Sequence, residues 1–448
     1  MQTRFRKIMG VAGSVCAFSF LAAPAWAGSF TEAYQAALNY DPKFQGARFE
    51  RDAGLQAIPL AKAGLLPGLS FTASRPRVHG SREFPNQQGT TTEQDLSYTA
   101  PQRSLNLRIP LFNPEGIMRY RQAETQATYS EVQLTFRALE LVERLGQAYF
   151  RALLAQEELK LLQAQVDAFS EQRRLAQRRF QAGEGTRTEV AESDARLDLA
   201  QAQLLDAKDA IEVSRRDLQA ITGKKMDEIA PIKPDFLPPT VEADSLQSWL
   251  SQAYQNSVLI QLRRLAFEAA QTEVSKSFSG HLPRVDVVGS ISKSSNESLS
   301  TLNQTTLQKT VGIQLNLPLY SGGYVNALTE QSRSLLQKAQ ADLDAEIANT
   351  ELSVRRGFLL ALSGLGKVQA YKKAVDSSEV ALEGVRRGLQ AGYRTNVDVL
   401  DAQRQVFVAK RDLAQARYDY LTARLRLFSA AGYPAEAVVA EIDQYLMQ

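Results

Sequence analysis

The chain has 448 residues, of which 44% are hydrophobic, an ordinary content for a globular protein. Lys and Arg number 52 and Asp and Glu number 49, so no strong net charge favours binding to nucleic acid. The sequence has two histidines and one cysteine, and it contains no phosphate loop and no set of metal ligands at a usual spacing. We therefore expect no enzyme, no cofactor and no metal site.

Residues 1–27 are typical of a secretory signal peptide. Basic residues precede an apolar run over 8–23, and Ala25-Trp26-Ala27 suits cleavage by signal peptidase. The apolar run is too short for a membrane-spanning helix. We expect the mature chain to start near Gly28 and to leave the cytoplasm.

The single cysteine, Cys16, lies inside this predicted signal. The mature chain would then have neither a disulfide nor a lipid-modified N-terminal cysteine. No later stretch approaches the ~20 apolar residues of a membrane helix. If the mature chain crosses a membrane, it must do so through β-strands.

The first half of the chain, 28–223, predicts two strands between helices of very different length. The expected elements are a helix over about 30–64, strands at 69–73 and 105–109 separated by a long loop at 77–97, a helix over about 117–181, and a helix at 188–222. At 1.5 Å per residue the longest helix spans roughly 100 Å. No compact globule needs such a rod.

A linker at 224–243 leads to a second half, 244–432, that repeats the first with an offset of 209 residues. Thr186 and Thr395, Val190 and Val399, and Gly223 and Gly432 are among the matched pairs. The second half predicts helices at about 244–280, 324–390 and 396–431 and strands at 285–287 and 311–317. We expect the linker and the C-terminal segment, 433–448, to form a belt where half-length helices meet.

Both long helices carry apolar residues every seven positions. In the second half the series is Ile347, Val354, Ala361, Val368, Val375, Leu382 and Leu389. Such a repeat is typical of helices that supercoil around their neighbours. These residues are expected to pack the helices together, without any chemical role.

The predicted strands alternate between apolar and polar residues, as in a membrane barrel with one face toward lipid and one toward a lumen. Four strands cannot close a barrel, and open edges are not tolerated in hydrocarbon. Eight strands leave an interior filled by side chains, whereas twelve leave a passage. At least three chains would share the barrel, unless the four strands form a soluble sheet that caps a coiled coil.

The sequence resembles the TolC family of outer-membrane factors, in its type I secretion branch, over nearly the whole mature chain. The motifs that carry the resemblance are Ala33-Tyr34-Gln35-Ala36-Ala37-Leu38 with Asp41-Pro42, Ala63-Gly64-Leu65-Leu66-Pro67, the Pro-Leu-aromatic turns at 110 and 318, and Gly392 to Asp401. The resemblance implies an α+β fold. Long antiparallel helices would form a coiled-coil tunnel in the periplasm, and each chain of a homotrimer would give four strands to a transmembrane β-barrel in the outer membrane.

The resemblance also implies a gate at the periplasmic end of the tunnel. Asp398 and Asp401 match aspartates that ring the pore, and Arg394 matches an arginine that ties neighbouring coils together. Thr188 and Glu189 match its partner positions. Two positions depart from the family pattern, because Glu189 stands where an aspartate is usual and Leu389 where the family can use a tyrosine.

Three apart on a helix, Asp398 and Asp401 would share a face. Repeated around a threefold axis, they would attract cations and raise one another's pKa. Without the resemblance, two aspartates near a helix start are typical of solvated residues that compensate the helix dipole.

The resemblance further implies that the turns between paired helices receive a periplasmic membrane-fusion adaptor. The candidate docking residues are Gly183, Gly185, Thr186, Gly392 and Thr395. The resemblance implies a passive exit duct for an exported protein, driven by an inner-membrane ABC transporter. A drug-efflux component of the same family and a soluble periplasmic coiled-coil scaffold are the alternatives. The sequence does not identify the exported substrate.

Overall fold

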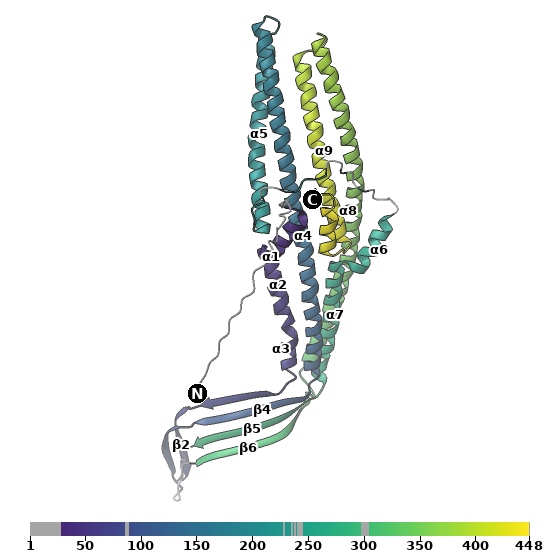
Figure 1. Cartoon of the computed structure of the whole chain (residues 1–448). Coiled ribbons are helices and arrows are strands. Elements are labelled where there is room, and N and C mark those ends of the chain that lie inside the picture. Colours follow the sequence, from purple (N-terminus) through teal and green to yellow (C-terminus); the bar gives the residue numbers. More distant parts are fainter. Residues whose placement is uncertain are drawn as a thin grey trace, which may run out of the picture.

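A computed structural model describes residues 28–85, 89–226, 229–233, 236, 239, 245–296 and 304–447. The predicted signal peptide and much of the predicted linker lie outside the described residues. The fold is α+β, as predicted: a long bundle of helices with a sheet projecting from one end (Figure 1).

The helices differ in length as the sequence predicts. They are α1 (Phe30–Tyr40), α2 (Pro42–Leu55), α3 (Ala57–Ala63), α4 (Pro114–Gln181), α5 (Arg187–Thr222), α6 (Leu246–Asn256), α7 (Val258–Phe278), α8 (Tyr324–Gln390), α9 (Asn396–Ala430) and α10 (Ala435–Asp443). With 68 residues, α4 is about 100 Å long. Within the described part of the chain, every helix is too polar or too short to cross a bilayer.

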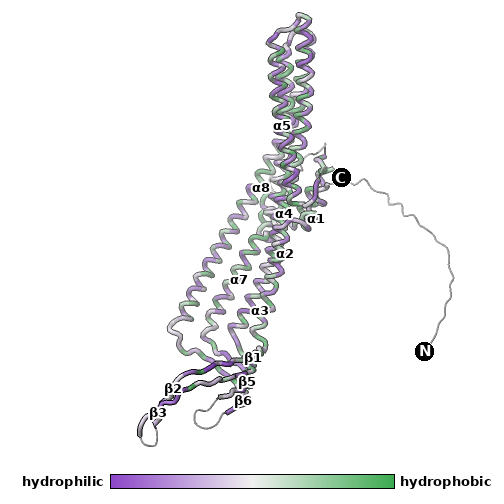
Figure 2. The backbone as a smooth tube through the Cα atoms, turned by 90° about the vertical axis from the view of Figure 1, so that its left-hand side faces the viewer, coloured by the Kyte–Doolittle hydropathy of each residue, from purple (hydrophilic) through white to green (hydrophobic). Residues whose placement is uncertain are grey.

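Each long helix lies against shorter partners along both of its halves. The α4/α5 and α8/α9 hairpins form the end of the bundle opposite the sheet, while α2, α3 and α7 run along the other half (Figure 1). Apolar and polar residues mix along every helix (Figure 2). The predicted heptad positions Val354, Ala361, Val368 and Val375 are buried in these contacts.

Two helices predicted to be continuous are interrupted in the structure. The predicted helix 30–64 ends first at Tyr40, because Pro42 lacks a backbone N–H and Asp41 instead caps α2 through a 2.9 Å hydrogen bond from the Phe44 amide. The predicted helix 244–280 is divided at Ser257 into α6 and α7. Asp41 is also held by Arg144 of α4 at 2.8 Å, so this break lies against the long helix.

The strands form one four-stranded sheet and one hairpin. The sheet has the order β1 (Gly68–Ser74), β4 (Gln102–Phe112), β5 (Arg284–Asn296), β6 (Gln304–Asn316), and all neighbours are antiparallel. The region 77–97, predicted to be a loop, is instead the hairpin of β2 (Arg77–Pro85) and β3 (Thr91–Thr99). That prediction was wrong because the two segments lack the apolar alternation that marks the other strands. They are nevertheless paired through their backbones.

The sheet has one apolar and one polar face. In register, Phe71, Leu105 and Ile291 lie side by side on one face, while Thr72, Ser104 and Ser292 do so on the other. The apolar side chains are solvent-exposed in the single chain, up to 83% for Val311. No helix covers this apolar face in Figure 1.

The main hydrophobic core lies midway along the bundle, where the half-length helices meet. Phe30 and Tyr149 pack edge to face at 5.3 Å between centroids, and the Tyr149 hydroxyl donates to the Gly28 carbonyl at 2.8 Å. Asp443 of α10 accepts hydrogen bonds from the Phe30 amide at 3.0 Å and the Thr31 hydroxyl at 2.9 Å. The C-terminal segment therefore fastens the start of the described chain.

Gly432 occupies a position that only glycine fits. Its φ is +83°, and a Cβ there would lie 2.4 Å from backbone atoms of Asn256. We predict that Gly432→Ala lowers the free energy of unfolding by at least about 1–2 kcal/mol, measured by thermal denaturation of detergent-solubilised protein. Gly183→Ala is the matched control, since Gly183 has a φ of +76° with nothing near its Cβ. Equal losses in the two variants would contradict the steric argument.

Candidate functional site

The two helical hairpins end in turns of the same construction. α4 ends at Gln181 and α5 begins at Arg187, while α8 ends at Gln390 and α9 begins at Asn396. Gly183 and Gly392 have φ values of +76° and +78°, which a residue with a side chain adopts only at a cost. The candidate docking residues thus form two matched tips at the end of the bundle away from the sheet (Figure 1).

A capping box begins the second helix of each hairpin. The Thr186 hydroxyl accepts from the Glu189 amide at 3.2 Å, and the Glu189 carboxylate accepts from the Thr186 amide at 3.1 Å. Thr395 and Asp398 repeat the arrangement at 3.2 and 2.8 Å. The Thr-x-x-acid spacing in both turns is a sequence signal for the start of a helix.

The two predicted gate aspartates face different partners within one chain. Asp398 is turned toward its own cap, where the Thr395 amide and hydroxyl lower the pKa of its carboxyl group. Asp401 instead forms an ion pair with Arg196 of α5 at 2.7 Å. Arg196 was missed from the sequence, since it lies 205 positions away and only the packing of the hairpins brings it close.

Asn396 and Ser193 join the same two helices just beside this ion pair. The Asn396 side-chain amide donates to the Ser193 hydroxyl at 3.4 Å, and both residues are buried. A small apolar cluster continues the contact away from the tip, formed by Phe169, Leu197, Ala200 and Leu400. Polar and apolar contacts therefore fasten the first hairpin to the second near the tips.

The remaining predicted gate residues lie on the surface of the single chain. Thr188 and Arg394 are exposed. The aliphatic part of Arg394 covers Gly388, where a Cβ would come within 2.7 Å of its Cγ. Among the described residues Arg394 forms no ion pair, but its charge contributes to the lowered pKa of the Asp398 carboxyl group.

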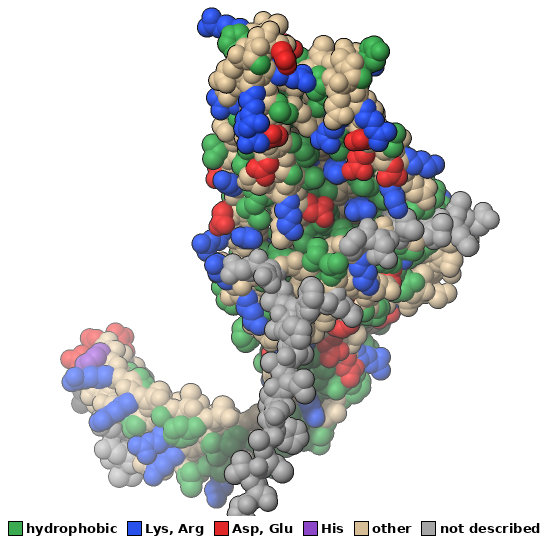
Figure 3. All heavy atoms as spheres, turned by 45° about the horizontal axis from the view of Figure 1, so that its top comes forward, with side chains coloured by type: hydrophobic (Ala, Val, Ile, Leu, Met, Phe, Trp, Pro, Cys, Tyr) green, Lys and Arg blue, Asp and Glu red, His purple; other side chains and the backbone are tan. Residues whose placement is uncertain are grey.

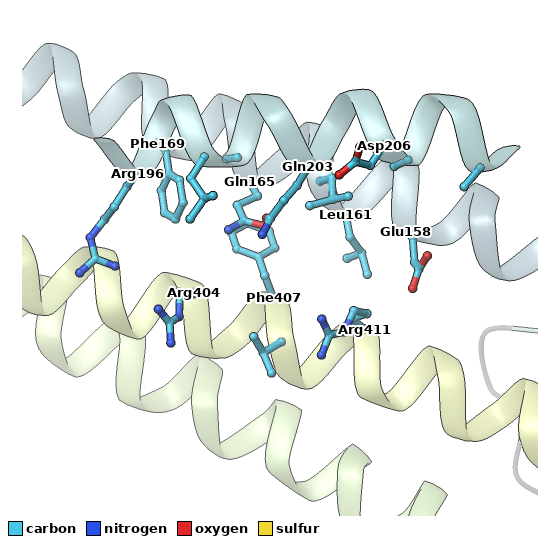
Figure 4. Close-up of a pocket in the computed structure, with 16 residues that line it drawn as sticks. Glu158, Leu161, Gln165, Phe169, Arg196, Gln203, Asp206, Arg404, Phe407 and Arg411 are labelled. Carbon is cyan, nitrogen blue, oxygen red and sulfur yellow. The ribbon is translucent and has the colours of Figure 1, made fainter. Parts of the chain in front are cut away.

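A groove of about 570 Å³ separates the two hairpins behind the tips (Figure 4). Leu161 and Phe169 of α4 and Phe407 of α9 give it apolar walls. Arg196, Arg404 and Arg411 point into it together with Glu158 and Asp206 (Figure 4). Seen from the tips, cationic and anionic side chains are mixed over the helical surface, without one dominant sign (Figure 3).

The described residues contain no group of three or more His, Cys, Asp or Glu placed to hold a metal ion. The candidate site of the described chain consists of helix contacts with charged groups beside them.

A protein-family comparison matches residues 33–224 and 249–433 to the outer membrane efflux protein family. The chain belongs to this family. The two matched segments together cover most of the chain and are separated by 225–248, which includes most of the predicted linker. It is an outer-membrane channel subunit of the TolC type that extends into the periplasm.

Two relatives carry names that concern secretion of proteases. The chain is 35% identical to the alkaline protease secretion protein AprF of Pseudomonas aeruginosa, over 92% of this chain and 86% of that protein. It is 34% identical to the proteases secretion protein PrtF of Dickeya chrysanthemi, over 90% of this chain and 87% of that protein. These relatives are secretion proteins by name, not enzymes.

Solved structures confirm the fold. The outer membrane protein VceC of Vibrio cholerae has a TM-score of 0.74 at 19% identity, covering 90% of this chain and 96% of that one. The likeness at this identity concerns the fold, including the α+β division between helices and sheet.

We predict that the start of α9 loosens in acid. The pKa of Asp398 is lowered in the folded chain, so the stability that its cap provides is present above the ordinary pKa of about 4 and is lost as the pH falls through the lowered value. Hydrogen-exchange protection of the first amides of α9 should therefore drop below about pH 4. Asp398→Asn should remove this pH dependence, and a pH-dependent loss that persists in the variant would contradict the assignment.

Proposed function

We propose that this chain is the outer-membrane subunit of a type I protein secretion system, a passive exit duct for an exported protein. The observation that carries the proposal is the exposed apolar face of a four-stranded sheet joined to two helices of 68 and 67 residues. The kinship with two protease secretion proteins supports the type of system.

The sheet supports a barrel shared by several copies. β1 and β6 are edge strands in the single chain, and unpaired backbone groups cost several kcal/mol each in lipid. Pairing β6 of one copy with β1 of the next would satisfy both edges. Three copies give twelve strands, enough to leave a passage, and we propose a homotrimer that contacts outer-membrane lipid.

The order of elements supports two structural repeats, 28–223 and 244–432, joined at 224–243 and closed by 433–448. Each half runs through short helices, strands, a long helix and a half-length helix. The described part of the linker pairs with the C-terminal segment through a bridge between Ile232 and Leu446. The linker and the C-terminus would thus form a belt around the middle of the tunnel.

We propose that the tips close the tunnel when no partner is bound. The exposed Arg394 guanidinium would reach Thr188 and Glu189 of a neighbouring copy, and the aspartates 398 and 401 would line the throat. The ion pair of Asp401 with Arg196 supports an added link within each chain. Leu389 has no polar group and cannot form the contact that a tyrosine forms at this position in the family. The ion pair of Asp401 with Arg196 would take the place of that contact.

Partners are proposed to bind at the tips. Gly183, Gly185, Thr186, Gly392 and Thr395 would receive a periplasmic membrane-fusion adaptor, which connects the duct to an inner-membrane ABC transporter. Energy and substrate choice would come from these partners. Docking would shift the balance from the closed to the open arrangement of the tips.

Drug efflux is the second candidate. The description of the matched family, outer membrane efflux protein, favours it. A soluble scaffold is disfavoured by the exposed apolar face of the sheet, which water would penalise.

We predict that the double variant Asp398→Asn/Asp401→Asn abolishes block of single-channel conductance by divalent cations. The two neutral amides remove up to six carboxylates from the throat of a trimer, and with them the attraction for cations. Planar-bilayer recordings measure the effect. Asp412→Asn is the matched control, because this aspartate is on α9 but far from the tip; unchanged block in the double variant would overturn the gate.

Deleting the gene should remove one or a few proteins from the culture medium, and restoring the gene should return them. Comparison of the secreted proteins by mass spectrometry gives the readout and identifies the substrate. Drug sensitivity of the same strain, with a normal set of secreted proteins, would favour efflux instead. Recovery of the protein as a freely soluble monomer would contradict both duct proposals.

A further inference from the structure

Three cations interrupt the apolar face of the four-stranded sheet. Arg103 of β4, Lys293 of β5 and Lys309 of β6 are all exposed. Each is two residues from an apolar neighbour on its strand: Leu105, Ile291 and Val311, respectively. Because side chains alternate between faces, all three cations lie on the apolar face and not on the polar one.

The strand register brings the three cations together. Arg103 lies directly opposite Lys293. On the neighbouring strand β6, Lys309 is opposite Ile291, which is two residues from Lys293 on β5. Lys309 is therefore a diagonal neighbour of Lys293. Diagonal neighbours of this kind are about 7–8 Å apart, within reach of long side chains. Ala73 stands on the other side of Arg103, and its small side chain leaves space beside the guanidinium.

Among the described neighbours of the cluster on this face, no acidic residue is present. The neighbours on this face are apolar or small, and among the described residues none of the three cations forms an ion pair. Like charges directly opposite each other destabilise a sheet. An anion from outside the chain that lay between the cations would offset this repulsion.

The cluster lies toward the end of the sheet away from the helices. β4 starts at Gln102 and leads into α4, while β5 leaves the helical part at Arg284. With the helices in the periplasm, this end faces the outside of the cell. A cation on the lipid face of a barrel is strongly destabilising at the bilayer midplane and nearly neutral close to an interface, so the cluster belongs at the level of lipid headgroups.

We propose that Arg103, Lys293 and Lys309 bind the phosphate groups of an outer-leaflet glycolipid. This inference rests on the proposed placement of the sheet in the outer membrane. The Arg103 guanidinium can hold a phosphate with two parallel hydrogen bonds, and the two lysines add point charges. The acyl chains of the same lipid would lie along the apolar residues nearer the helices, such as Leu107 and Ile313.

The test measures lipid binding to the purified full-length trimer. Native mass spectrometry in detergent follows titration with lipid A that carries both phosphates. The triple variant Arg103→Gln/Lys293→Gln/Lys309→Gln should bind it roughly 100-fold more weakly, since each surface cation contributes about a factor of five. The control variant Lys208→Gln/Lys372→Gln/Lys373→Gln removes three exposed cations from the helical part and should bind like the parent.

Two further probes define the ligand. Lipid A stripped of phosphate should bind the parent as weakly as intact lipid A binds the triple variant, and excess inorganic phosphate should compete only weakly. Equal binding of the stripped lipid would overturn the proposal. So would equal affinity for phosphatidylglycerol, since that result would show a generic anionic-lipid surface.

Channel recordings separate this proposal from the proposed function. The triple variant should remain a trimer and conduct like the parent. The three cations lie on the apolar face toward lipid, whereas the polar face of the sheet would line the lumen. A parent protein that forms neither trimers nor channels would contradict the duct. Normal channels with unchanged lipid binding in the triple variant would contradict only the lipid site.

Discussion

The open edges of the four-stranded sheet are the constraint on which the rest of the structure depends. β1 comes from the first half of the chain and β6 from the second, so the free edges belong to different repeats. A contact between unlike edges is head-to-tail, and it closes into a ring only when the rotation between copies fits. The long helices, fixed to the sheet at one end, are then carried around the same axis.

Contacts at the middle of the bundle hold the helices, which are about 100 Å long, in fixed positions relative to one another. The hydrogen bonds from Phe30 and Thr31 to Asp443 and the bridge between Ile232 and Leu446 join the first repeat and the linker to the C-terminal segment. The ring contact of Phe150 with Tyr418 joins the first repeat to the second. The tips have weaker contacts, one ion pair and one hydrogen bond between hairpins beside a small apolar cluster. Rigidity at the middle and weaker contacts at the tips suit a duct that opens at its end.

Much of the fold could be predicted from the sequence because the long helices and the four strands carry strong periodic signals. α8 was predicted at its observed bounds, and α4 begins three residues earlier than expected because Pro114 suits the first turn of a helix. The β2–β3 hairpin escaped prediction since its polar sequence lacks an alternating pattern. At the tips the capping boxes were readable from spacing alone. The contact of Arg196 with Asp401 was not, since it depends on how two hairpins pack.

The length of α4 also sets how much of an extended passenger the proposed duct would hold. An extended polypeptide advances about 3.3 Å per residue, so roughly 30 residues fill the helical part from the tips to the sheet. Any longer passenger extends beyond both ends of this part at once. In the proposed duct, the leading segment of such a passenger would leave the helical part on the side of the sheet while its trailing segment has not yet entered at the tips.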